Sequence, residues 1–398
     1  MLALIFVFDW FILRPAARPG QLVVGINNLG ISSPRFNTKA KFYAWSDILE
    51  ANVESVQGVV ALQIRLNTSK ERRDARSYIN GVNPARPFIP LAALLPLEQE
   101  CLLGVIHGYL NGRNIASFNN SPNNSAVNTL REERLFQESL VALAPLTWVT
   151  YGLIGMNVAI WVAMVASGAG LLQGRSDILL DWGGNSAYLV QQGEWWRLLS
   201  AAFLHSGVLH LLMNMIGLWA TGVTVERIYG HKFFLLIYLG AGLLGSAASL
   251  HFSAQKAVSV GASGAVFGVA GALLVAVLQH RKELPKMFGK QAVSGMSVFI
   301  LYSLVQGLGT PGIDNAAHVG GLIAGVALAV ILPRRFNQAQ FDRTAAVRGM
   351  LALGTLGLAV WFVVVQTPKG ATDLRALAHA GIAFERGVKA FDTAIRAL

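Results

Sequence analysis

The stretch GASGAVF at residues 261–267 places Ser263 between two glycines at the head of an apolar segment. That segment continues to about residue 280 without a formal charge, which is close to the length that a helix needs to cross a bilayer. Polar groups inside such a helix are costly and are therefore candidates for function. Taken alone, a serine with small neighbours is more simply a packing residue. The rest of the sequence decides between the two interpretations.

The composition is that of a protein that crosses a membrane several times. Of the 398 residues, 54% are hydrophobic and only 13% are charged, and the mean hydropathy is +0.49. The net charge of +11 is interpreted as basic loops on the cytoplasmic side, because no nucleic-acid recognition motif accompanies it. We expect a lipid bilayer as the environment and no nucleic-acid partner. The single cysteine, Cys101, is expected to be a buried thiol in a helix over residues 97–110.

Seven hydrophobic segments of about spanning length occupy the second part of the chain. Basic residues gather after the second, fourth and sixth segments, as in the loop 281–290. The positive-inside rule therefore places these loops and the N-terminal domain in the cytoplasm. The predicted spans are residues 149–172, 208–226, 232–253, 262–280, 291–309, 315–332 and 347–366.

The segments outside the membrane differ in pattern. Short β-branched or alternating runs, separated by turns, precede the helix at 97–110, which predicts a small α+β domain. A polar stretch then indicates a linker. The predicted division is 1–113 for the soluble domain, 114–148 for the linker and a short helix, 149–332 for the membrane core, 333–366 for a loop and the seventh span, and 367–398 for an amphipathic helical tail.

Three spans that run from outside to inside carry a polar residue in their first turn or two, namely His210, Ser263 and His318. Three distant segments thus place polar groups at one depth. His210 and Asn214 are four residues apart and share a helix face, so both can donate to one oxyanion. A serine hydroxyl is a weak nucleophile without an adjacent base, and His318 is the only well-placed candidate.

The glycines around these residues favour close approach of helices. Backbone N–H groups at the start of a helix lack partners and can also donate to an oxyanion at Ser263. Gly261 and Gly264 leave room beside the serine. Gly321 and Gly325 would let the sixth span pack tightly on a neighbour and bring its histidine within reach of the serine.

Taken together, these residues resemble the rhomboid family of intramembrane serine proteases over about residues 149–332. Each motif is weak alone, whereas five in order, each on the corresponding span, are highly specific. The matching pieces are Trp196-Arg197 in the loop after the first span, His210-Leu-Leu-Met-Asn214, Glu226-Arg227 with Gly230, Gly261-Ala-Ser263-Gly264, and Ala317-His318 with Gly321 and Gly325.

The resemblance implies an all-α polytopic membrane fold, a six-helix bundle plus a seventh C-terminal transmembrane helix, beside the small cytosolic α+β domain. It implies a serine endopeptidase that cuts membrane-anchored proteins near the outer end of their transmembrane segment, without metal or cofactor. Ser263 is then the nucleophile and His318 the general base of a dyad. His210, Asn214 and the Ser263 backbone would form the oxyanion hole, with Trp196, Arg197 and Glu226 in structural roles. Phe267 stands where many members of the family carry a tyrosine that stacks on the histidine.

Several alternatives stay open. Asp314, one turn before His318, either orients that histidine or is a loop-end carboxylate that faces water. His205 and His231 are expected to be solvated, with a supporting role at the site as the alternative for His205. The rival function is that of a catalytically inactive rhomboid-like protein that binds or guides transmembrane clients. Such relatives typically lose the serine or the histidine, and this chain keeps both.

The N-terminal domain carries a second resemblance. Gly30-Ile31 and the run 42–48 are similar to the strand-and-turn signature of bacterial pleckstrin-homology-like domains. No partner of this domain is predicted. The expected location is a bacterial inner membrane, crossed several times, with the N-terminal domain in the cytoplasm.

Overall fold

The computed structural model describes residues 23–36, 40–56, 59–67, 86–91, 94, 96–110, 125–252, 258–310 and 312–366. The chain forms two compact units, one of residues 1–138 with 281–294 and one of residues 139–280 with 295–398. Much of the predicted linker and the whole predicted tail at 367–398 lie outside the described residues.

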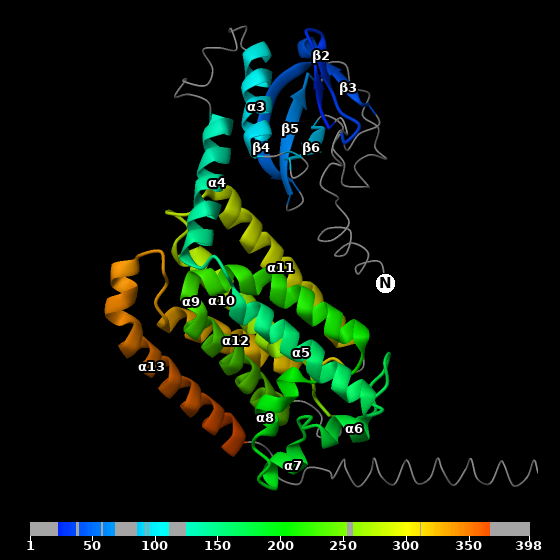
Figure 1. Ribbon diagram of the computed structural model, residues 1–398, viewed down its shortest axis with the longest axis vertical. Coiled ribbons are helices and arrows are strands. Elements are labelled where there is room, and N and C mark those ends of the chain that lie inside the picture. The colour runs from blue at the N-terminus through cyan, green and yellow to red at the C-terminus, as the bar shows by residue number, and fades with distance from the viewer. Residues whose placement is uncertain are drawn as a thin grey trace, which may run out of the picture. The chain divides into compact units, whose positions relative to one another are not determined.

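In the described part of the first unit, two antiparallel three-stranded sheets are followed by the helix α3 (Figure 1). Along one central strand, buried Leu62 and Ile64 alternate with more exposed Gln63 and Arg65, so one face of the sheet turns inward. The elements are β1 (Gly25–Ile26), β2 (Gly30–Ser32), β3 (Phe42–Ala44), η1 (Trp45–Asp47), β4 (Ile48–Val56), β5 (Val59–Leu66), β6 (Phe88–Pro90) and α3 (Pro96–Leu110).

Helix α3 covers the inward face of this sheet. Its Leu103 and Ile106 are fully buried in the same core as the inward residues of β5, and Met287 joins them. The ring of Tyr109 stacks on Trp45 at 4.8 Å and 7°. Cys101 lies on the outer side of α3 and is exposed, so the expectation of a buried thiol is wrong.

The second unit is helical, and several of its helices are apolar, as in a multi-pass membrane protein (Figure 1). Among the described residues, α5, α9, α11 and α13 are long and apolar enough to cross a membrane, and α10 and α12 are shorter apolar helices. The elements are α4 (Ser125–Leu143), which begins in the first unit, α5 (Trp148–Ala166), α6 (Ser176–Asp181), α7 (Ala187–Gln191), α8 (Arg197–Ser200), η5 (Ala201–Phe203), α9 (Val208–Phe252), α10 (Ser263–Gln279), α11 (Lys286–Gly309), α12 (Asn315–Ile331) and α13 (Gln338–Val365).

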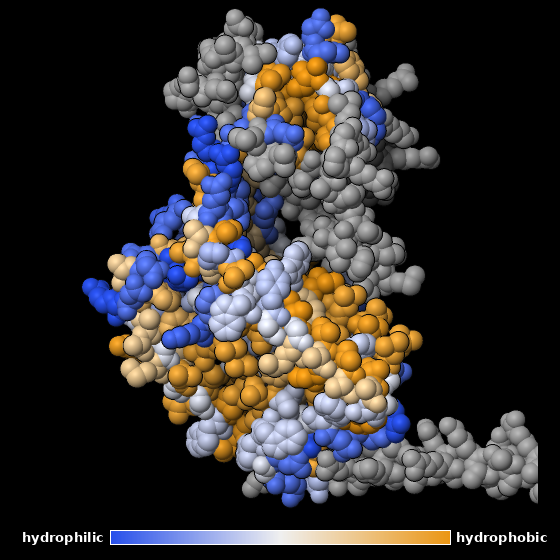
Figure 2. Space-filling model, in the orientation of Figure 1, coloured by the Kyte–Doolittle hydropathy of each residue, from blue (hydrophilic) through white to orange (hydrophobic). Residues whose placement is uncertain are grey.

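Apolar side chains cover much of the visible surface of the helical unit (Figure 2). Large exposed hydrophobic residues include Val298 and Leu301 of α11 and Leu358 and Trp361 of α13. An apolar surface of this kind is unfavourable in water and is suited to lipid.

Two helix ends differ from the predicted spans because of local capping. Helix α5 ends at Ala166 and not at residue 172, since Gly168 has a positive φ of 91°. Helix α13 begins at Gln338, nine residues before the predicted span, because the Asn337 side chain accepts a hydrogen bond from the Gln340 amide (3.0 Å). The predicted second and third spans fall on the two arms of α9, which meet at Gly230 with φ 77°.

Helices α9, α10 and α12 pack against one another at the centre of this unit. Gly321 and Gly325 of α12 lie directly on the backbone of Gly264 and Gly268 of α10, where an added Cβ would overlap backbone atoms. Backbones this close require glycine on both helices. This packing sets the spacing between the first turns of α10 and α12.

Candidate active site

Ser263 is the first residue of α10. The residues before it form an extended segment that bonds to the preceding loop, through Asn185 with Ser259 and through the Gly261 amide with the Ala201 carbonyl (2.9 Å). Gly261 has φ 132°, which residues with a Cβ rarely adopt. The sharp entry into α10 therefore depends on this glycine and holds Ser263 at the helix N-terminus.

His318 lies in the first turn of α12 and faces Ser263. Its Nε2 is 2.9 Å from the Ser263 Oγ. The imidazole is buried and lies flat on the ring of Phe267, with centroids 4.4 Å apart and planes at 6°. Its Nδ1 makes no hydrogen bond to any residue that the structure describes. The His318 ring is thus oriented by stacking and by the serine.

The position of α12 is also fixed by Asp314, its N-cap residue. The Asp314 carboxylate accepts a hydrogen bond from the Ala317 amide (3.1 Å) and another from the Ser249 hydroxyl near the end of α9. Asp314 therefore joins α9 to the helix that carries His318, and the interpretation of a carboxylate that simply faces water is wrong. Sequence reasoning missed the Ser249 contact because 65 residues separate the partners.

His210 and Asn214 occupy the first two turns of α9. A Cβ built on Gly261 would lie 2.7 Å from the His210 Nε2 and 3.8 Å from the Ser263 Oγ, so the ring and the hydroxyl converge on one small space. Asn214 is buried, and its Nδ2 donates to the His210 carbonyl at 2.9 Å. Since that nitrogen carries two hydrogens, the second N–H remains available for another acceptor.

Two further polar groups surround His210. The Ser206 Oγ lies 3.1 Å from the His210 Nδ1. The ring of His205 meets the His210 ring edge to face at 5.2 Å. His205 is 1% exposed, so the expectation that it is solvated is wrong, and burial, with His210 nearby, lowers its pKa to about 3. His205 is therefore neutral at physiological pH.

The loop between α5 and α9 is built around Arg197. This side chain is 1% exposed and donates to the carbonyls of Leu180 (2.6 Å) and Gly184 (3.0 Å). It also pairs with Glu194 at 2.6 Å and stacks on Trp196, 4.7 Å from the ring centroid. A buried guanidinium with these partners holds together a loop that has little regular structure.

Glu226 anchors the start of α5 from α9. Its fully buried carboxylate accepts hydrogen bonds from the amides of Val149 (3.1 Å) and Thr150 (2.8 Å) and from the Thr150 hydroxyl (2.6 Å). A carboxylate at a helix N-terminus satisfies unpaired amides and complements the helix dipole. His231 contacts the same carboxylate at 2.5 Å and stays partly exposed, so it is paired as well as open to solvent.

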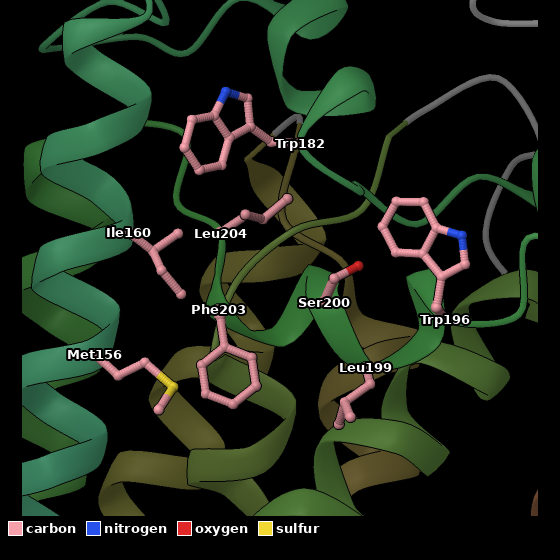
Figure 3. A pocket seen from close by; sticks show the side chains of 8 residues that line it. All are labelled: Met156, Ile160, Trp182, Trp196, Leu199, Ser200, Phe203 and Leu204. Carbon is pink, nitrogen blue, oxygen red and sulfur yellow. The ribbon is translucent and has the colours of Figure 1, made fainter.

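A separate apolar pocket of about 360 Å³ opens between α5 and the loop (Figure 3). Met156 and Ile160 of α5 face Phe203 and Leu204. The rings of Trp182 and Trp196 also line the pocket, and Trp196 is drawn on the side away from α5. Ser263 and His318 do not line this pocket. Its lining is almost entirely apolar and offers no acid–base pair.

Comparison with known proteins agrees with this geometry. Residues 192–335 match the family model of the Rhomboid domain. The chain is 41% identical over 187 residues to "Rhomboid protease GluP" of Bacillus subtilis, which covers 46% of this chain and 35% of that protein. It is 39% identical over 164 residues to "RHOMBOID-like protein 4" of Arabidopsis thaliana, with 40% of each chain covered. The chain therefore spans less than half of the length of these two relatives.

A shorter relative is matched over most of its length. The chain is 33% identical over 142 residues to "Putative rhomboid protease YdcA" of Bacillus subtilis, which covers 36% of this chain and 69% of that protein. The match to the Rhomboid domain, at residues 192–335, includes the helices on which Ser263 and His318 lie 2.9 Å apart. The chain belongs to the rhomboid family.

Proposed function

We propose that this protein is an intramembrane serine endopeptidase that hydrolyses peptide bonds of membrane-anchored proteins near the outer end of their transmembrane segment. The observation that carries the proposal is the 2.9 Å contact between the Ser263 Oγ and the His318 Nε2, with the histidine stacked on Phe267. Relatives named as rhomboid proteases support the same chemistry.

In the proposed reaction, the Ser263 oxygen attacks the carbonyl carbon of the scissile bond while His318 accepts the hydroxyl proton. A tetrahedral intermediate forms, and its collapse breaks the C–N bond as His318 returns the proton to the leaving amine. The acyl group stays on Ser263. Water, deprotonated by His318, then attacks the ester, releases the acid and restores the serine.

The negative oxygen of the intermediate requires donors. The Val266 amide donates to the Ala262 carbonyl (2.9 Å), so the amides of Ser263 and Gly264 precede the hydrogen-bond ladder of α10. Together with the His210 Nε2 and the second N–H of Asn214, they supply donors beside the serine. The positive end of the α10 dipole acts in the same direction.

We place the active site near the outer surface of a bacterial inner membrane. Basic residues in the loops that follow α10 and α12 support this orientation, since such loops stay in the cytoplasm. The N-terminal unit is then cytoplasmic, with a recruiting or regulatory role. Membrane proteins whose spanning helix opens near that surface are the proposed substrates.

A serine-reactive fluorophosphonate probe tests the proposal. Purified wild-type protein in liposomes should be labelled and should cleave a single-span model substrate. Ser263→Ala should lose both, while Ser294→Ala, at an exposed position on α11, should lose neither. Wild-type protein that binds the substrate but shows no labelling and no cleavage would instead support an inactive, client-binding member of the family.

A further inference from the structure

Ser206 has no role in the reaction as described so far, yet its hydroxyl is fixed beside His210. It precedes α9 in the loop, and its Oγ lies 3.1 Å from the Nδ1 of His210. Its carbonyl accepts a hydrogen bond from the Gly174 amide at 2.5 Å, and two residues further on the Val208 amide donates to the Leu171 carbonyl at 3.0 Å. Gly174 also lies so close that an added Cβ would approach the Ser206 Cα to 2.9 Å.

A neutral imidazole has one N–H, and its position decides what the ring can do. To stabilise an oxyanion at Ser263, His210 must carry its hydrogen on Nε2, the nitrogen that faces Gly261 and the serine. The Nδ1 must then be bare and accept a hydrogen bond. In the other tautomer, a lone pair on Nε2 would face the oxyanion and repel it.

The Ser206 hydroxyl can satisfy His210 in the tautomer that the oxyanion requires, because a hydroxyl can donate as well as accept. It lies 3.1 Å from the Nδ1 in a partly buried site, and among the described residues it is the hydrogen-bond partner of this nitrogen. The buried ring of His205 packs against the same imidazole, with centroids 5.2 Å apart. A charged His210 with both nitrogens protonated is therefore disfavoured. The ring of His210 thus lies between the Ser206 hydroxyl and the ring of His205.

We propose that Ser206 is a positioning residue that holds His210 in the Nε2–H tautomer and so completes the oxyanion site. This inference rests on the proposed proteolytic function. Ser206 acts through His210 and does not touch the substrate. Loss of its hydroxyl should therefore reduce the rate of the chemical step and leave substrate binding unchanged.

The kinetic test compares Ser206→Ala with Ser206→Thr, which keeps the hydroxyl. Cleavage of a single-span model substrate is measured in liposomes. Ser206→Ala should lower kcat about tenfold with unchanged KM, less than the 10²–10³-fold typical of removing an oxyanion donor itself. Ser206→Thr should restore most of the rate. An unchanged kcat in Ser206→Ala would overturn the assignment.

A double-mutant cycle separates this role from a structural one. In a His210→Ala background, Ser206→Ala should cause no further loss, because no imidazole remains to be oriented. The same fractional loss in both backgrounds would contradict the inference. If wild-type protein shows no Ser263-dependent cleavage, the proposed function falls as well. If wild-type protein cleaves and Ser206→Ala matches it, only the assignment of Ser206 falls.

The tautomer of His210 can also be measured directly on the wild-type protein, so this test does not depend on the stability of a Ser206 variant. Ring-¹⁵N histidine spectra at pH 7.5 report which nitrogen of each imidazole is protonated, and His210→Gln identifies the His210 signals. We expect a protonated Nε2 and a bare, hydrogen-bonded Nδ1 on His210. Protonation of Nδ1 on this residue would overturn the inference.

Discussion

His210 and His318 need opposite tautomers for their proposed roles. His318 must present a bare Nε2 to the Ser263 hydroxyl, 2.9 Å away, while His210 must present an Nε2–H to the same space. In these tautomers each bare nitrogen has a hydroxyl beside it that can donate: Ser206 at the Nδ1 of His210 and Ser263 at the Nε2 of His318. In the proposed roles, one residue type performs acid–base work at His318 and electrostatic work at His210.

Replacing Asn214 tests whether a single side-chain donor stabilises the proposed oxyanion. Asn214→Ala removes one of several proposed donors, so turnover should fall by roughly 10²-fold or less, while membrane insertion stays normal. The residual rate reflects the donors that remain on His210 and the α10 backbone. Steady-state cleavage in liposomes measures this, and an unchanged kcat would remove Asn214 from the site.

The lowered pKa of His205 predicts that the stability of the folded protein depends on pH. Its folded pKa of about 3 lies below the usual 6.5, so above about pH 6.5 neither state is protonated and folding is unaffected. As pH falls from 6.5 toward 3, the unfolded state gains a proton that the folded state refuses, which costs about 1.4 kcal/mol per pH unit. His205→Gln should therefore lose less thermal stability than wild type between pH 7.5 and pH 5. Equal losses would show that His205 is not held neutral.

Some of this residue-scale detail is visible in the sequence and some is not. Ser263 and His318 stand out as polar groups in apolar segments, whatever the fold. Ser206 does not, and a role for His205 is only one of two alternatives, because both lie in a loop whose path depends on Arg197 and on the contacts of Gly174. The sequence alone does not indicate which polar residues of an irregular loop will contact the site.

At the scale of helices, glycine contacts decide the spacing of α10 and α12. Gly325→Ala would force a methyl group into the backbone of Gly268 and separate the two helices, so cleavage should fall by more than tenfold and the melting temperature should drop. The matched control is Gly354→Ala on α13, where an added Cβ meets nothing within 4 Å and helix propensity improves. Similar behaviour of the two variants would contradict the proposed role of this close contact.

Helix existence is easier to predict from this sequence than helix contacts. Apolar runs mark the helices, and missed caps at Gly168 and Asn337 account for the shifted ends. The Glu226 carboxylate caps α5 although 76 residues separate it from Thr150, and no local sequence pattern around Thr150 indicates this contact. Such long-range caps follow from the tertiary packing of α5 on α9, which hydrophobic periodicity alone does not specify.

At the scale of the molecule, we expect the helical unit to perform the cleavage without the strands of the N-terminal unit. All residues of the proposed dyad and oxyanion site belong to the helical unit. Deleting residues 1–124 removes the described strands and α3 but keeps Glu133, whose carboxylate accepts the Phe288 amide at 3.0 Å. We expect the truncated protein to insert and to retain Ser263-dependent cleavage of a short model substrate in liposomes. Stable, inserted protein without that cleavage would make the N-terminal unit part of the catalytic machinery.

The most direct measurement compares kcat/KM for wild type, Ser263→Ala, His318→Ala and the double variant in the same liposomes, with Ser294→Ala as the control. Because the serine and the histidine are proposed to act as one unit, each single variant should lose at least about 10⁴-fold, and the double variant should be no worse than either. Membrane insertion should be equal in all five proteins. Near-normal cleavage by Ser263→Ala or by His318→Ala would contradict the dyad.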